Sequence, residues 1–246
     1  MGKRIIISFA LCLFVMTGCS AVFNKANVTP GQHAGVFEKT IKKTVRFNYQ
    51  LYLPDGYSQK GGPWPLMIFL HGAGERGDDP ELIKLHGLPK LAASGQSFPF
   101  IIASPQCPTE KWWPNLTDEL NAFIDDIEAK YAVDPRRIYL TGLSMGGFGT
   151  WSLAISRPDR FAAIAPICGG SERYLAKNIK DIPVWVFHGA KDTVVPIERS
   201  EIMVRALEQL GADVRFTIYP DAGHDSWTET YEKKELYEWF LSHRKR

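Results

Sequence analysis

The sequence predicts an α/β protein with a mostly parallel central sheet and helices on both faces. Short, nearly continuous apolar runs such as 66–70 and 184–187 are typical of strands buried on both faces of a parallel sheet. Amphipathic segments of helical length separate several of these runs, which is the alternation expected of this class. With 246 residues, the chain is long enough for one large domain with a buried core.

The first 18 residues are typical of an export signal. Lys3 and Arg4 precede the apolar run 5–16, which is too short to span a membrane. The run ends in Met16-Thr17-Gly18-Cys19, which resembles the lipobox of bacterial lipoproteins, where cleavage precedes a lipidated cysteine. This resemblance implies a lipid anchor on Cys19 and a place on the periplasmic side of a membrane or at the cell surface. Ser20 resembles an outer-membrane sorting signal, and the alternative is an ordinary secretory signal with an incidental cysteine.

Residues 19–35 contain asparagine, glycine and proline and predict a flexible tether, so that the folded domain is expected over 36–246. Without Lys3 and Arg4, the basic and acidic residues balance at 27 each. A neutral chain of this kind offers nothing to a polyanion, so no nucleic-acid partner is expected. Contact with a membrane is expected through the lipid anchor only.

The predicted strands are apolar or β-branched runs bounded by turn residues. In chain order they are 36–43, 45–53, 66–70, 100–104, 137–141, 161–167, 184–187 and 214–219. The predicted helices are amphipathic or end at a helix-breaking residue. They are 80–94 with an irregular part, 117–131, 148–156, 198–210 and 229–242. The gap between strands 161–167 and 184–187 has room for little more than a short helix, so no large lid and an open site are expected.

Gly142-Leu143-Ser144-Met145-Gly146 lies between a predicted buried strand and a predicted helix. It places a serine on a very tight strand-to-helix turn, which is the context of a nucleophile elbow. Glycine neighbours are needed because a serine held at a strained backbone angle leaves no space for side chains beside it. Ser144 is therefore the candidate nucleophile, and the alternative is a glycine-rich turn with an incidental serine.

A base and an acid are placed at the same edge of the predicted sheet. Asp192 lies in the loop after strand 184–187, and His224 in the loop after strand 214–219. A histidine can take the serine proton near neutral pH, and a carboxylate can fix its tautomer. The chain order serine, aspartate, histidine is that of the nucleophile-elbow hydrolases. Asp221 is the alternative acid and His188 the alternative base.

The loop His71-Gly72-Ala73-Gly74-Glu75-Arg76-Gly77 follows the central strand 66–70. Its bare backbone can present N–H groups to a developing oxyanion. We expect the N–H groups of Ala73 and Met145 to form the oxyanion hole, with Gly74 as the alternative to Ala73. The His71 side chain is expected to anchor this loop rather than to act as a base.

Three tryptophans are candidate walls of a substrate pocket, Trp112 and Trp113 in a proline-rich loop and Trp227 after the histidine loop. The alternative is that one of the first two packs in the core. Cys107 and Cys168 are expected to be small buried hydrophobes, because their strands are not neighbours in this fold. No cysteine and histidine spacing indicates a metal site.

Four blocks carry a resemblance to the α/β-hydrolase family: 71–77, 142–147, 192–196 and 222–224. The chain most resembles its lid-less branch of phospholipase/carboxylesterase, dienelactone hydrolase and prolyl-oligopeptidase-like proteins, which includes feruloyl and acetyl-xylan esterases. The resemblance implies an α/β-hydrolase catalytic domain without metal or organic cofactor. It implies hydrolysis of short acyl or aryl esters, including acyl groups on polysaccharides, through an acyl-enzyme. The alternatives are a serine peptidase of prolyl-oligopeptidase-like type and a non-catalytic binding lipoprotein.

Overall fold

The computed structural model describes residues 30–245, so the predicted export signal and Cys19 lie outside the described residues. The compact unit spans Lys43–Arg246. Within residues 30–245, no helix is both long and apolar enough to cross a bilayer.

The compact unit is built on a seven-stranded sheet in the order β1-β3-β2-β4-β5-β6-β7. The strands are β1 (Tyr49–Tyr52), β2 (Trp64–Leu70), β3 (Ile101–Pro105), β4 (Val133–Leu143), β5 (Ala163–Ile167), β6 (Val184–Gly189) and β7 (Val214–Tyr219). The edge strand β1 is antiparallel to β3, and all other neighbours are parallel. Residues 66–70 of β2 are completely buried, as their apolar sequence predicts for a central strand.

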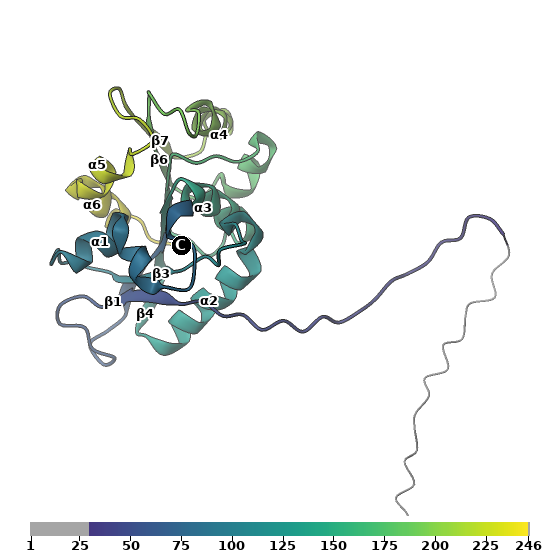
Figure 1. Cartoon of the computed structure of the whole chain (residues 1–246), viewed down its shortest axis with the longest axis horizontal. Helices are drawn as coiled ribbons and strands as arrows, with labels where there is room; N and C mark the ends of the chain where they lie inside the picture. The colour runs from purple at the N-terminus through teal and green to yellow at the C-terminus, as the bar shows by residue number, and fades with distance from the viewer. Residues whose placement is uncertain (1–29, 246) are drawn as a thin grey trace, which may run out of the picture. The chain divides into compact units, whose positions relative to one another are not determined.

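Helices cover both faces of this sheet, which confirms the predicted fold class. Figure 1 shows α1 (Gly87–Ala93), α5 (Trp227–Glu232) and α6 (Lys234–Ser242) on one side of the strands. On the other side lie α2 (Thr117–Lys130), α3 (Met145–Ser156) and α4 (Glu198–Gln209). Each layer encloses its own apolar cluster: one joins the sheet to α2, α3 and α4, and the other joins it to α1, α5 and α6.

Short 3₁₀ helices form several of the loops that follow the carboxyl ends of the strands. They are η1 (Ala73–Glu75), η2 (Pro80–Leu85), η3 (Trp113–Asn115) and η4 (Arg173–Ile179). Between β5 and β6 the chain forms only η4, so the expectation of no large lid is confirmed. The edge where β2, β4, β6 and β7 end is therefore left open.

Three of the predicted elements differ clearly from the structure. Residues 36–43 form no strand, and of 45–53 only Tyr49–Tyr52 is a strand. Apolar and β-branched residues alone do not make a strand, because its backbone needs a hydrogen-bonded neighbour, and the sheet ends at β1 on this side. The helix predicted over 229–242 is two helices, since Lys233 has an extended backbone with ψ 118°. The Tyr237 hydroxyl donates to the carbonyl of Tyr231 at this break.

Candidate active site

The three residues predicted to form the catalytic group lie in one hydrogen-bonded line. Ser144, Asp192 and His224 follow β4, β6 and β7, whose parallel register brings their carboxyl ends to one edge. The Oγ of Ser144 is 2.9 Å from Nε2 of His224. The Nδ1 of His224 is 2.7 Å from Oδ2 of Asp192. Ser144 and His224 are partly exposed, so a substrate can reach both from solvent.

Ser144 has the strained backbone expected of a nucleophile elbow, with φ 52° and ψ −115°. Such a tight turn brings the helix start against the neighbouring strand β2. A Cβ atom on Gly146 would lie 1.8 Å from the carbonyl oxygen of Leu70, so only glycine fits there. The Ser144 N–H donates to the carbonyl of Ile167 at 3.0 Å and reaches Sγ of Cys168 at 3.3 Å, which ties the elbow to β5.

Asp192 is held as an ionised acceptor. Its Oδ1 accepts hydrogen bonds from the N–H groups of Val194 and Val195, each at 2.9 Å. Burial raises the pKa of Asp192, but the hydrogen bond from His224 and those from the two amides outweigh it, and the pKa lies below its ordinary value. The carboxylate therefore stays charged at neutral pH and faces His224 with its other oxygen.

The hydrogen bonds assign the tautomer of His224. Because the Asp192 carboxylate can only accept, Nδ1 of His224 carries the proton and donates it. Nε2 then has a free lone pair that can accept the proton of the Ser144 hydroxyl. The ring is packed edge-on against Trp227, with 5.2 Å between ring centroids, which holds its orientation.

Neither alternative residue takes the place of Asp192 or His224, although Nε2 of His188 lies 3.3 Å from Oδ2 of Asp192. His188 is completely buried. Its ring nitrogens contact the Ser200 hydroxyl and the Val195 carbonyl, each at 2.8 Å. Burial lowers the pKa of His188, which leaves a neutral ring supporting the Asp192 loop. Asp221 is exposed and pairs with Lys191 at 2.7 Å, away from His224.

The loop of residues 71–77 lies beside the elbow with two unpaired amides close by. Within the described part of the chain, neither the N–H of Ala73 nor that of Met145 donates a hydrogen bond. Both are the first residues of helical turns, where amides have no intrahelical partner. They can therefore receive a negatively charged oxygen. The third candidate, Gly74, lies one residue further along η1 and is exposed.

His71 is an anchor of this loop, as its sequence position predicts. Its Nε2 accepts a hydrogen bond from the N–H of Cys107 at 2.9 Å. The carbonyl of His71 accepts the indole N–H of Trp113 at 3.0 Å. The side chain is 1% exposed and therefore cannot reach a substrate.

Of the three candidate tryptophans, one faces solvent beside the elbow. Trp113 is fully buried, so it belongs to the core and the prediction that it walls a pocket is wrong. Trp227 is buried behind His224 and shapes the site through that ring. Trp112 is 47% exposed. With Pro114, Asn115 and Phe148, it lines a groove of about 280 Å³.

Phe148 lies one turn after the nucleophile, because its N–H donates to the Ser144 carbonyl at 3.0 Å. The sequence analysis did not single out Phe148. Its position four residues after the elbow serine, on the same face of the helix, is the signal that indicates it. Arg76 lies over the Trp112 ring with 5.9 Å to the centroid, so the groove adjoins the 71–77 loop.

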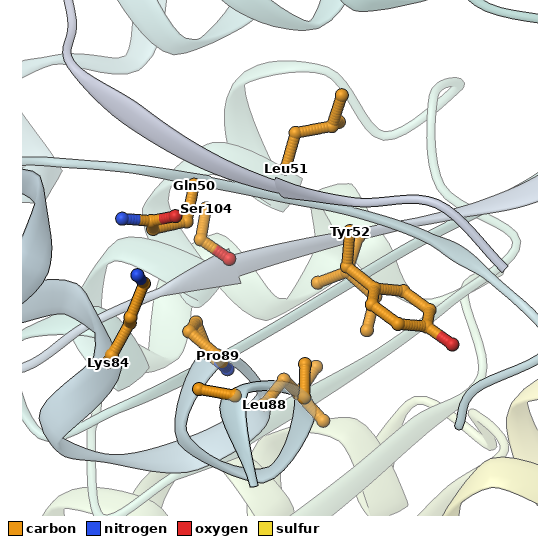
Figure 2. A pocket seen from close by; sticks show the side chains of 10 residues that line it. Gln50, Leu51, Tyr52, Lys84, Leu88, Pro89 and Ser104 are labelled. Atoms are coloured by element: carbon orange, nitrogen blue, oxygen red, sulfur yellow. The ribbon is translucent and has the colours of Figure 1, made fainter. Parts of the chain in front are cut away.

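A second hollow lies away from these residues. It has a volume of about 210 Å³ and is lined by residues of β1, β3, η2 and α1. Figure 2 shows Gln50, Tyr52, Lys84 and Ser104 around it. No histidine is among its lining residues, and Ser104 is only 1% exposed, whereas Ser144 is partly exposed and faces His224. The chemistry is therefore assigned to the edge that holds Ser144.

Cys107 and Cys168 are unpaired and buried, as expected. Cys168 lies directly behind Ser144, as expected of a buried residue near the rim of the active site. Cys168, Asp192 and His224 are the one group among the described residues whose ligand atoms lie close enough to hold a metal, within 4.8 Å of one another. Burial raises the pKa of the Cys168 thiol, and Asp192 and His224 are hydrogen-bonded to each other, so these donors suit proton transfer better than metal binding.

Comparison with known proteins places these features in context. The model of the dienelactone hydrolase family matches residues 35–237. A poly(3-hydroxyalkanoate) depolymerase C of Paucimonas lemoignei is 30% identical over 133 residues, covering 44% of this chain and 32% of that protein. A feruloyl esterase D of Neurospora crassa is 28% identical over 162 residues, covering 61% of this chain and 54% of that protein. The chain thus spans less than two thirds of the length of these relatives.

A solved structure of a thermostable esterase is also similar. It has a TM-score of 0.69 and 36% sequence identity, and the match covers 80% of this chain and 59% of that chain. Other structures with the same fold include an acylaminoacyl peptidase of Pyrococcus horikoshii, at 17% identity and a TM-score of 0.57. At that identity the likeness concerns the fold alone.

Proposed function

The chain belongs to the dienelactone hydrolase family, and from this premise we propose that it is a serine carboxylic-ester hydrolase. The observation that carries the proposal is the hydrogen-bonded line from Ser144 through His224 to Asp192 on a strained elbow. The serine is the nucleophile, the histidine the base and the aspartate the group that orients the base. Neither a metal nor an organic cofactor is needed for this chemistry.

The reaction proceeds through an acyl-enzyme. Nε2 of His224 takes the hydroxyl proton as Oγ of Ser144 bonds to the ester carbonyl carbon. The carbonyl oxygen becomes an oxyanion, which accepts hydrogen bonds from the N–H groups of Ala73 and Met145. The C–O bond to the alcohol then breaks, and His224 gives its proton to the leaving oxygen. A water molecule repeats these steps on the acyl-enzyme, releasing the acid and restoring Ser144.

The open edge supports short acyl or aryl esters and acyl groups carried on a polysaccharide. Without a large lid, the alcohol side can extend into solvent, which a polymer requires. We propose that the groove of Trp112 and Phe148 receives an apolar or aromatic part of the substrate. A polymer appears in the name of one relative, the poly(3-hydroxyalkanoate) depolymerase, and a feruloyl ester in the name of another, the feruloyl esterase.

The test compares esters with amides. Purified protein is expected to hydrolyse p-nitrophenyl acetate and butyrate faster than p-nitroanilides carrying the same acyl groups. A fluorophosphonate is expected to label Ser144 alone and to stop this turnover. Faster cleavage of peptide amides would instead favour a serine peptidase, which uses the same three residues. If the protein hydrolyses neither esters nor amides, while the fluorophosphonate reacts with serines other than Ser144, a non-catalytic binding protein would be favoured.

We also propose that the chain is an exported lipoprotein, anchored through Cys19 at the periplasmic side of a bacterial membrane or at the cell surface. The support is the sequence: Lys3 and Arg4, the apolar run 5–16, and the lipobox-like residues that end at Cys19. Cys19→Ala is expected to move the protein from the membrane fraction to the soluble fraction of expressing cells, because the acyl chains can no longer be attached. Continued membrane retention of this variant, measured by fractionation and immunoblot, would contradict the anchor.

A further inference from the structure

A buried carboxylate lies inside the loop that carries the Ala73 amide. Glu75, the last residue of η1, is 3% exposed, and its Oε2 has no hydrogen-bond partner among the described residues. Oε2 lies 3.6 Å from Nδ1 of His71, and Oε1 lies 3.5 Å from Nε2 of His86. A buried charge persists only when nearby groups compensate for it, so these two histidines account for its presence. The reaction described above makes no use of Glu75.

His71 can orient the carboxylate but cannot supply a full positive charge. Its Nε2 must keep a lone pair to accept the N–H of Cys107 at 2.9 Å. The single ring proton is therefore on Nδ1, which points to the carbonyl of Gly72 at 2.6 Å as well as to Glu75. His86 has no such restriction, and it is 40% exposed on its side chain. His86 can therefore present an N–H at Nε2 to Oε1 of Glu75, 3.5 Å away.

The same hydrogen bond sets the direction of the oxyanion amide. In a planar trans peptide, the C=O of one residue and the N–H of the next point in opposite directions. The Gly72 carbonyl is turned inward to His71, so the Ala73 N–H is turned away from that ring. A Cβ atom on Gly72 would lie 3.2 Å from Oε2 of Glu75 and 2.9 Å from Cδ1 of Leu143. Gly72 therefore lies between the Glu75 carboxylate and Leu143, the residue that precedes Ser144.

We propose that Glu75 is a positioning residue for the oxyanion hole: shared between His71 and His86, its carboxylate holds the Gly72–Ala73 peptide with the Ala73 amide directed at the reacting carbonyl. The proposal rests on the proposed ester hydrolysis. His86 also packs on Trp227 with 5.7 Å between ring centroids, and Trp227 packs on His224. The Glu75 and His86 pair therefore joins the oxyanion side of the site to the base side.

The test is steady-state hydrolysis of p-nitrophenyl acetate by the full domain. Loss of one oxyanion donor typically lowers kcat by about 10²- to 10³-fold, and Glu75→Ala is expected to approach the lower of these values. Glu75→Gln keeps the shape but not the charge, and His86→Gln removes the imidazole ring beside Oε1 of Glu75. Each variant is expected to lower kcat by roughly tenfold. KM should stay within about twofold, because the amide acts on the transition state rather than on bound substrate. The matched control is Glu81→Gln, an exposed glutamate in the next turn that pairs with Lys84, which should leave kcat unchanged.

A double variant tests whether the two residues act together. If His86 acts through Glu75, the Glu75→Gln, His86→Gln double variant should be no slower than Glu75→Gln alone. If the reductions in kcat of the two single variants multiply in the double variant, the proposal is wrong. It is also wrong if Glu75→Gln leaves kcat unchanged, or changes only KM or the midpoint of thermal unfolding. Should Glu75→Ala not fold, Glu75→Gln and the surface variant His86→Gln give the same decision. Turnover by the unchanged protein distinguishes a failure of the proposed function from a failure of the role proposed for Glu75. If the unchanged protein hydrolyses no ester, the proposed function fails; if it does, only the role of Glu75 is in question.

Discussion

Ser144→Ala is expected to reduce ester hydrolysis by roughly 10⁴- to 10⁶-fold, because no other group can form the acyl-enzyme. The variant removes only Oγ, and the backbone contacts of the elbow stay in place. The N–H of residue 144 still donates to the Ile167 carbonyl, and an alanine at this position adopts the same backbone φ of 52° as the serine. The loss should therefore appear in kcat without a loss of folding.

The measurement is turnover of p-nitrophenyl butyrate, with circular dichroism and thermal unfolding as controls for the fold. The fluorophosphonate should no longer label the variant. Activity in Ser144→Ala within about tenfold of the unchanged protein would show that the nucleophile lies elsewhere, given the size of effect expected for a lost nucleophile. Ser104 in the hollow of Figure 2 would then be the next residue to replace.

The sequence was sufficient to predict the line of Ser144, Asp192 and His224 because each residue lies at or just after the carboxyl end of a parallel strand. Parallel strands end at one edge, so residues that follow them meet there whatever their separation along the chain. The same rule did not reveal Glu75 and His86. Their contact depends on how η1 and the start of α1 fold back on the sheet, and irregular loops leave no periodic pattern to read.

Packing decided the remaining differences. The adjacent residues Trp112 and Trp113 look alike in sequence, yet the indole of Trp113 is buried against His71 while Trp112 lies at the surface. Which of the two tryptophans turns inward depends on the space that the protein core leaves beneath the loop that follows β3. Residues 36–43 form no strand for a related reason, since a strand needs a hydrogen-bonded partner as well as suitable side chains.

Asp192→Asn is the second large effect, and the structure specifies its origin. Oδ1 of Asp192 accepts two backbone amides, so an asparagine keeps its oxygen there and places its NH₂ group where Oδ2 was. That NH₂ group faces Nδ1 of His224, which must then become an acceptor. The ring proton moves to Nε2, and Nε2 can no longer take the proton of Ser144. The expected loss in kcat at neutral pH is about 10⁴-fold.

The pH dependence separates this tautomer effect from a loss of stability. The folded pKa of Asp192 lies below its ordinary value of 3.8, so its charge stabilises the fold above that pH. This contribution disappears only as the pH falls through the lower, folded value. Asp192→Asn should therefore lose thermal stability at pH 7, and the difference from the unchanged protein should shrink as the pH falls below about 4. The kcat deficit should instead persist across pH 6 to 8, measured by stopped assays with p-nitrophenyl acetate, because the asparagine amide that sets the wrong tautomer has no titratable group. A variant that recovered full activity once it was kept folded at low temperature would contradict the assigned role of Asp192.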